Sequence, residues 1–96
     1  MKKCCEDWLK AQFGDDRDTI EAVYAEYVET MSELAKQLAV ARQGGDSAVL
    51  DRVLHTVKGS AAMAGDAELS ELANRARGSL DASLLDAVAQ RMSELA

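Results

Sequence analysis

Residues 20–41, IEAVYAEYVETMSELAKQLAVA, carry the pattern that decides the fold. Their apolar positions alternate in steps of four and three: Ile20, Tyr24, Tyr27, Met31, Leu34, Leu38 and Ala41. An α-helix turns by about 100° per residue, so this spacing gathers them on one face. We predict a long amphipathic helix. Asp18 precedes Glu21 at the spacing of an N-terminal cap, and Gly44 and Gly45 mark the end.

Shorter stripes of apolar residues occur in the sequence before and after residues 20–41. Upstream, Cys5, Trp8, Leu9 and Phe13 predict a short first helix that ends before Gly14. Downstream we predict three more helices: from Asp46 to a stop at Gly65, from Asp66 to Gly78, and from about Asp81 onward. Their expected core positions are Leu50, Val53, Leu54, Val57, Ala61, Ala64, Leu69, Leu72, Ala73, Ala76, Leu84, Leu85, Val88, Met92 and Leu95.

Short connections between helices that each have one apolar face predict packing around a shared core. The expected fold is all-α, an antiparallel up-and-down four-helix bundle with a short additional N-terminal helix. The chain has 96 residues, 48% of them apolar and none of them proline, which suits one domain over residues 1–96.

The charge and the absence of long apolar runs exclude several classes of function. The formal net charge is -6 and the basic residues are scattered, so we expect no nucleic-acid partner. No apolar stretch approaches the roughly 18 to 20 residues of a membrane span, and the first residues lack the apolar run of a secretory signal. We therefore expect a cytoplasmic protein without membrane insertion.

The cysteines and the single histidine give little support to a metal site. Cys4 and Cys5 are neighbours that rarely meet disulfide geometry with each other, and with His55 they supply too few ligands for zinc. A packed or frayed first turn is the simplest interpretation of the pair. Lipidation or a cross-link between two chains are alternatives that nothing else in the sequence supports.

His55, the only histidine, is expected to face away from the core. On a helical projection it lies about 150° from the mean direction of the apolar stripe of its helix. The residues three, four and seven positions away share its face: Ala48, Lys58, Gly59 and Ala62. Three of these four are very small, so a partner or a phosphoryl group could approach the imidazole without collision.

The chemistry of these residue types suits phosphoryl transfer. An exposed imidazole is largely uncharged at neutral pH and keeps a nucleophilic nitrogen. Lys58 lies one turn along, where its ammonium could pair with phosphate oxygens. Gly59 costs about 1 kcal/mol relative to alanine inside a helix, which suggests that clearance beside His55 is worth that loss.

The string HTVKGSAAMAG, residues 55–65, resembles the histidine-containing phosphotransfer (HPt) domains of bacterial-type multistep phosphorelays. The resemblance rests on His55, Lys58, Gly59, Ala61 and Gly65, followed by Leu69 and Leu72 at the usual spacing of the family. It implies that His55 is phosphorylated, on Nε2, that Lys58 assists the phosphoryl group, and that Gly59 leaves room for it. The family often has an acidic or amide residue near Arg77, so we expect a basic residue there to alter the choice of partner.

The same resemblance implies response-regulator receiver domains, phosphorylated on aspartate, as donor and acceptor, and a hybrid sensor histidine kinase upstream. The chain shows no obvious metal cluster and no Walker-type glycine loop. We therefore expect a monomeric carrier without ATP-dependent kinase activity or a cofactor of its own, whose receiver partner supplies Mg²⁺.

A receiver that docks over His55 needs a modest apolar patch with a charged rim on the second and third helices. Candidate contact residues are Ala48, Arg52, Ala62, Met63 and Arg77. Two alternatives remain: a helical module that binds a receiver without transferring phosphate, and a structural oligomerisation bundle, for which the heptad-like run from Ile20 to Ala41 is the best evidence.

Overall fold

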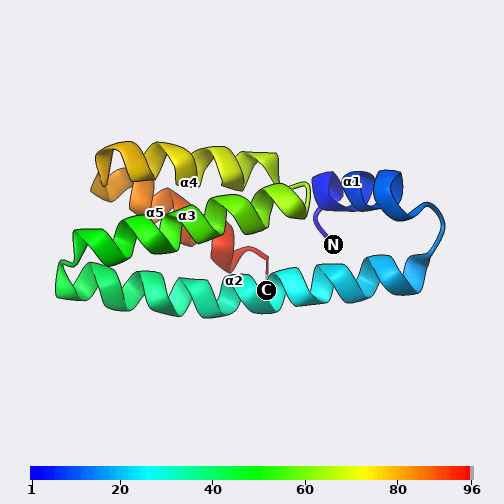
Figure 1. Ribbon diagram of the computed structural model, residues 1–96, viewed down its shortest axis with the longest axis horizontal. Coiled ribbons are helices and arrows are strands. Elements are labelled where there is room, and N and C mark those ends of the chain that lie inside the picture. Colours follow the sequence, from blue (N-terminus) through cyan, green and yellow to red (C-terminus); the bar gives the residue numbers. More distant parts are fainter. Residues whose placement is uncertain (96) are drawn as a thin grey trace.

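The protein is a bundle of α-helices, described by a computed structural model over residues 1–95 (Figure 1). The described part contains five helices and no strand, which confirms the predicted all-α class and the short N-terminal helix. The bundle is elongated, about 44 Å long and 20 Å wide. The helices are α1 (Lys3–Phe13), α2 (Arg17–Gly44), α3 (Ser47–Met63), α4 (Ala67–Ser79) and α5 (Ala82–Ser93).

Helix α2 spans the length of the molecule and begins two residues earlier than predicted. Its N-cap is Asp16, whose carboxylate accepts hydrogen bonds from the backbone N–H and the hydroxyl of Thr19, so the assignment to Asp18 was wrong. Asp18 instead lies in the first turn, where its negative charge still complements the helix dipole. The predicted end is confirmed, because Gly45 takes a left-handed conformation with φ 65° immediately after the last helical residue.

The caps of the later helices follow the predicted aspartates, with one different ending. Asp46, Asp66 and Asp81 each cap a helix by accepting a backbone N–H bond. Helix α4, however, continues through Gly78 to Ser79, and its C-cap is Leu80, a non-glycine residue with φ 51°. A glycine inside a helix weakens it without necessarily stopping it, so Gly78 was a misleading stop signal.

The predicted stripes form the core. Helix α3 lies between α2 and α4, and α5 packs on both α4 and α2 (Figure 1). In α2 to α5, all the expected core positions are buried except Tyr24, Leu72 and Leu84, which are partly buried against the same cluster. The buried face of these four helices was therefore correctly predicted from periodicity alone.

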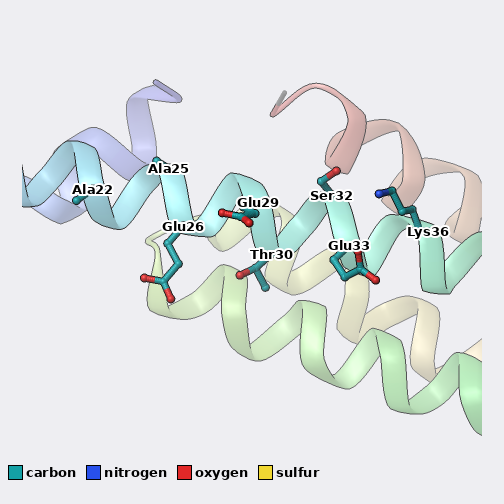
Figure 2. Close-up of a pocket in the computed structure, with 8 residues that line it drawn as sticks. All are labelled: Ala22, Ala25, Glu26, Glu29, Thr30, Ser32, Glu33 and Lys36. Atoms are coloured by element: carbon teal, nitrogen blue, oxygen red, sulfur yellow. The ribbon is translucent and has the colours of Figure 1, made fainter.

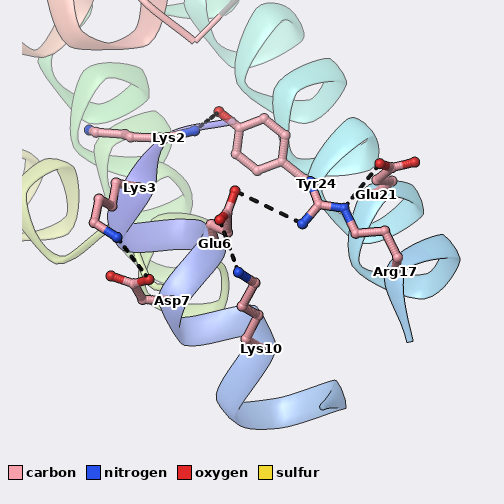
Figure 3. Close-up of polar contacts among 8 residues, drawn as sticks. All are labelled: Lys2, Lys3, Glu6, Asp7, Lys10, Arg17, Glu21 and Tyr24. Atoms are coloured by element: carbon pink, nitrogen blue, oxygen red, sulfur yellow. Dashed lines mark hydrogen bonds and ion pairs between the residues drawn. The ribbon is translucent and has the colours of Figure 1, made fainter. Parts of the chain in front are cut away.

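Helix α1 packs against the N-terminal half of α2 and is fastened by polar contacts (Figure 3). The backbone N–H of Lys2 donates to the Tyr24 hydroxyl at 3.1 Å, and Glu6 pairs with Lys10 and, at 3.9 Å, with Arg17. Only Cys5 and Leu9 of the predicted stripe are buried, whereas Trp8 and Phe13 are exposed, 36% and 42% respectively. The four-residue stripe was thus too wide, because α1 has one neighbouring helix to pack on.

A buried carboxylate joins three distant segments at this end of the bundle. Asp66, fully buried, accepts from the Lys2 ammonium and from the Tyr27 hydroxyl, each at 2.9 Å, while it caps α4. Burial and this hydrogen bond raise the pKa of Tyr27. Gly65 next to it has φ 77°, and a side chain there would overlap Trp8. The α3–α4 turn is therefore built around the packing of α1.

Among the described residues, none of the helices combines the length and the apolar content needed to cross a lipid bilayer.

Candidate functional site

His55 lies on the solvent-facing side of α3, nine residues into the helix. The opposite side of α3 supplies the core residues Val53, Leu54 and Val57, all at most 2% exposed. The predicted outward direction of the imidazole is confirmed. The histidine is therefore available to a partner and is not a core residue satisfied by internal packing.

Arg77 of α4 contacts the imidazole directly. Its Nη1 lies 3.0 Å from Nδ1 of His55, and its Nε and Nη2 reach the two carboxylate oxygens of Asp51 at 3.1 and 3.4 Å. Asp51 lies one turn before His55 on α3, so the guanidinium spans both side chains. The hydrogen bond from Arg77 lowers the pKa of Asp51, which keeps that carboxylate ionised at neutral pH.

Lys58 is partly buried one turn after His55, and its carbonyl oxygen accepts a 3.0 Å bond from the Ser70 hydroxyl of α4. Within residues 1–95, no carboxylate forms an ion pair with its ammonium. The ammonium is thus not committed to an internal ion pair, and the Ser70 bond links this turn of α3 to α4.

Gly59 is exposed beside His55, and a methyl group added to it would meet no atom of this chain within 4 Å. Internal packing therefore does not require a glycine at this position. Its backbone is helical, so conformation does not require one either. What the glycine leaves is open surface next to the imidazole.

The other predicted contact residues lie on two edges of this face. Ala48, Arg52 and Ala62 are exposed on α3. Met63, 76% exposed, lines a shallow hollow at the α2–α3 edge together with Val23 and Thr30 of α2. Arg77 is engaged by Asp51 and His55 and stands beside the imidazole, not at an outer rim.

A groove of about 360 Å³ begins next to the imidazole turn and runs between α3 and α4 toward α1. Lys58 and Ala62 form one wall, Ser70 and Asn74 of α4 form the other, and the indole of Trp8 closes the end. The groove therefore joins the face of α3 that carries Lys58 and Ala62 to residues of α4 and α1. Periodicity contained no signal for the Trp8 contribution, which depends on where α1 packs.

A larger hollow, about 810 Å³, lies along the exposed side of α2 and is separate from this groove (Figure 2). Small side chains such as Ala25 and Ser32 alternate there with Glu29 and Glu33. Its lining includes no histidine or cysteine. This hollow therefore does not include His55.

The described residues contain no group of three or more histidine, cysteine or acidic side chains arranged to hold a metal ion. Cys4 is exposed and Cys5 is buried, and burial raises the pKa of the Cys5 thiol to about 12. Cys5 is therefore a protonated, packed residue of the first helix, as the simplest interpretation of the pair predicted.

Two features of the site were missed at the sequence level. The Asp51 carboxylate could have been noticed, since it lies four residues before His55 and shares its helical face. The contact between Arg77 and His55 could not, because it joins residues 22 positions apart on different helices.

Comparison with family models gave one match: the model described as the Hpt domain matches residues 22–96. This range covers α2 from residue 22 onward and all of α3, α4 and α5, and it leaves out α1. Neither the curated proteins nor the solved structures gave a match.

Proposed function

The chain belongs to the Hpt domain family, which performs histidine-containing phosphotransfer in phosphorelays, and we propose that this chain carries the phosphoryl group on His55. The observation that supports this most strongly is the exposed position of His55, the only histidine in the chain, on the outer face of α3. A phosphoryl carrier needs a nucleophilic imidazole that a partner can reach.

We propose that a receiver domain phosphorylated on aspartate is the donor and that the aspartate of another receiver is the acceptor. Hpt domains work with receiver domains and with kinases and are carriers, not kinases themselves. A hybrid sensor histidine kinase would supply the first receiver. Lys58, whose ammonium has no ion-pair partner in residues 1–95, would then stabilise charge on the phosphoryl group.

We propose that the receiver brings Mg²⁺ and the acidic residues that hold it. The nearest carboxylate to His55 on its own helix, Asp51, is already paired with Arg77. In this scheme the chain has no ATP-dependent kinase activity and acts in the cytoplasm, where receivers and kinases exchange phosphoryl groups.

The docking surface in this proposal is the exposed face around His55. It includes Gly59, which leaves open space beside the imidazole, and the edge residues Ala48, Arg52, Ala62 and Met63. Antiparallel up-and-down packing of α2 to α5 within a single domain would hold this face, supported by the contacts α2–α3, α3–α4, α4–α5 and α2–α5.

We infer that the protein acts as a monomer. The heptad-like stripe of α2, the best evidence for oligomerisation, is occupied by the core: Tyr27, Met31, Leu34 and Leu38 are each at most 6% exposed. Residues already packed inside one chain cannot also form a coiled-coil seam with another.

The test is to incubate the protein with a panel of phosphorylated receiver domains and Mg²⁺ and to follow acid-labile phosphate on the chain. The control is His55→Gln. Because His55 is exposed, this variant should keep its helical circular dichroism and melting temperature while accepting no phosphate. A folded wild type that accepts nothing but binds a receiver would favour the non-transferring interaction module; a large loss of stability in His55→Gln would mean that the histidine is structural.

A further inference from the structure

Arg77 holds one of the two imidazole nitrogens of His55. Its Nη1 is 3.0 Å from Nδ1, and Asp51 fixes the rest of the guanidinium through contacts of 3.1 and 3.4 Å. The Arg77 side chain is 29% exposed and that of Asp51 is 49% exposed. The imidazole is thus bound on its Nδ1 side by a residue of the neighbouring helix α4.

The chemistry of a guanidinium decides which way this hydrogen bond runs. Arginine has five N–H donors, no acceptor, and a charge that it does not lose in proteins. Arg77 must therefore donate and Nδ1 must accept, so Nδ1 carries no proton while the contact lasts. A neutral ring in this state has its proton on Nε2.

Building on the proposed function, we infer that Arg77 is a positioning residue that selects the Nε2–H tautomer of His55 and has to release Nδ1 before each phosphoryl transfer. A carboxylate at position 77 would have the opposite effect, because it accepts and so favours a proton on Nδ1. The identity of this one residue of α4 thus sets the resting state of the nucleophile.

The transfer step shows why release is needed. The bond that forms joins Nε2 to phosphorus, and the bond that breaks joins phosphorus to the aspartyl oxygen of the donor, which keeps the electron pair as a carboxylate. Nε2 can attack only with a free lone pair, so the ring proton must be on Nδ1, where Arg77 would otherwise donate. The phosphorylated ring then loses that Nδ1 proton to water, and Arg77 can return.

The same contact would protect the phosphorylated state. A neutral ring phosphorylated on Nε2 has a lone pair on Nδ1, which suits the Arg77 donor. Protonation of Nδ1 turns the ring into a better leaving group, and a cation held at that nitrogen opposes protonation. Arg77 would therefore lengthen the lifetime of phosphohistidine. The charged residues on the helical face of His55 are Asp51, Arg52 and Lys58 of α3, and Arg77 reaches the ring from α4.

The single histidine makes the tautomer directly measurable by ¹⁵N NMR of the full chain, since both imidazole nitrogens are assigned without ambiguity. At a pH where the ring is neutral, we expect a protonated Nε2 and an acceptor Nδ1 in the wild type. In Arg77→Met the Nδ1–H population should rise several-fold, the order expected for loss of a charge-assisted hydrogen bond at an exposed site. Arg75→Met, which removes an exposed charge from the same helix, is the matched control and should leave the ring unchanged.

A second variant, Asp51→Asn, weakens the contact by which Asp51 holds the Arg77 guanidinium beside the ring. It should also raise the Nδ1–H population of His55, by a smaller factor than Arg77→Met. A proton on Nδ1 in the wild type, or tautomer populations that do not change in folded Arg77→Met, would overturn the inference.

The lifetime is tested separately with phosphoramidate as a small-molecule phosphoryl donor, which needs no receiver. In mildly acidic buffer, phosphorylated Arg77→Met should hydrolyse several-fold faster than the wild type and Arg75→Met; equal rates would overturn the protective role. The tautomer is measured on the unphosphorylated protein, so the NMR result does not depend on the receivers. If no receiver phosphorylates the wild type, the proposed function is refuted, and the inference about Arg77 is still decided by the NMR experiment.

Discussion

Gly59→Ala should make the protein more stable while it impairs phosphoryl transfer. Gly59 lies inside α3, four positions before its last residue, Met63, and has a helical backbone. A methyl group there would meet nothing within 4 Å, so the substitution brings no steric cost within the chain. The gain in helix propensity should therefore appear in full in the free energy of unfolding.

The expected gain is about 1 kcal/mol, the difference between glycine and alanine in a helix interior. For a domain of this size it corresponds to a rise in melting temperature of roughly 4–8 °C. Thermal and urea unfolding followed by circular dichroism would measure it. Gly78→Ala is the matched control: this helical glycine also has open space around it, but it lies next to the end of α4, so its gain should be smaller.

The effect on transfer separates the functional explanation of the glycine from an accidental one. The methyl group of Gly59→Ala should slow phosphate acceptance from a receiver, and the longer, charged side chain of Gly59→Glu should slow it at least about tenfold, or about 1.4 kcal/mol. Ala39→Glu is the control for added charge, since Ala39 is an exposed residue of α2, one turn before Arg42, which pairs with Asp86 of α5. A stabilised Gly59→Ala and a folded Gly59→Glu that both transfer at the wild-type rate would refute the idea that this glycine provides clearance.

Three further outcomes follow from the contacts described above. Lys58→Ala should slow phosphate acceptance without abolishing it, because it removes charge stabilisation and leaves the nucleophile in place; an unchanged rate in a receiver transfer assay would remove Lys58 from the mechanism. Asp66→Ala should cost about 3 kcal/mol in urea unfolding, because it removes a buried carboxylate from a partly buried ion pair with Lys2 and leaves the buried Tyr27 hydroxyl without its acceptor. A loss below about 1 kcal/mol would contradict that account. Hydrogen bonds from Thr19 and from Ser83 lower the pKa of the capping carboxylates Asp16 and Asp81. The stabilisation of the fold by these two caps should therefore be complete above the ordinary carboxylate pKa of about 4, and it should be lost as the pH falls through the lowered pKa of each carboxylate. A pH series of melting temperatures that stays flat through this acidic range would show that the caps contribute nothing.

Some helix ends could be predicted from the sequence and others could not. The stretch from Gly14 to Thr19 contains three aspartates, any of which could cap α2, and the structure selects Asp16 because its carboxylate reaches the backbone N–H of Thr19. Leu80 ends α4 with a positive φ that a leucine rarely adopts, so the nearby Gly78 was the more reasonable stop signal. Caps depend on local geometry that several neighbouring residues can satisfy.

The sequence by itself determined the all-α class, the buried faces of α2 to α5 and the outward direction of His55, because helical periodicity relates every residue to its neighbours on the same helix. Only the tertiary structure decided which residues meet between helices: Arg77 at His55, Trp8 at the end of the groove, and Asp66 between Lys2 and Tyr27. Periodicity sets the direction of a side chain about its own helix axis. The rotation and offset of one helix against another depend on how all the core side chains pack together, and these determine which polar groups come within hydrogen-bonding distance.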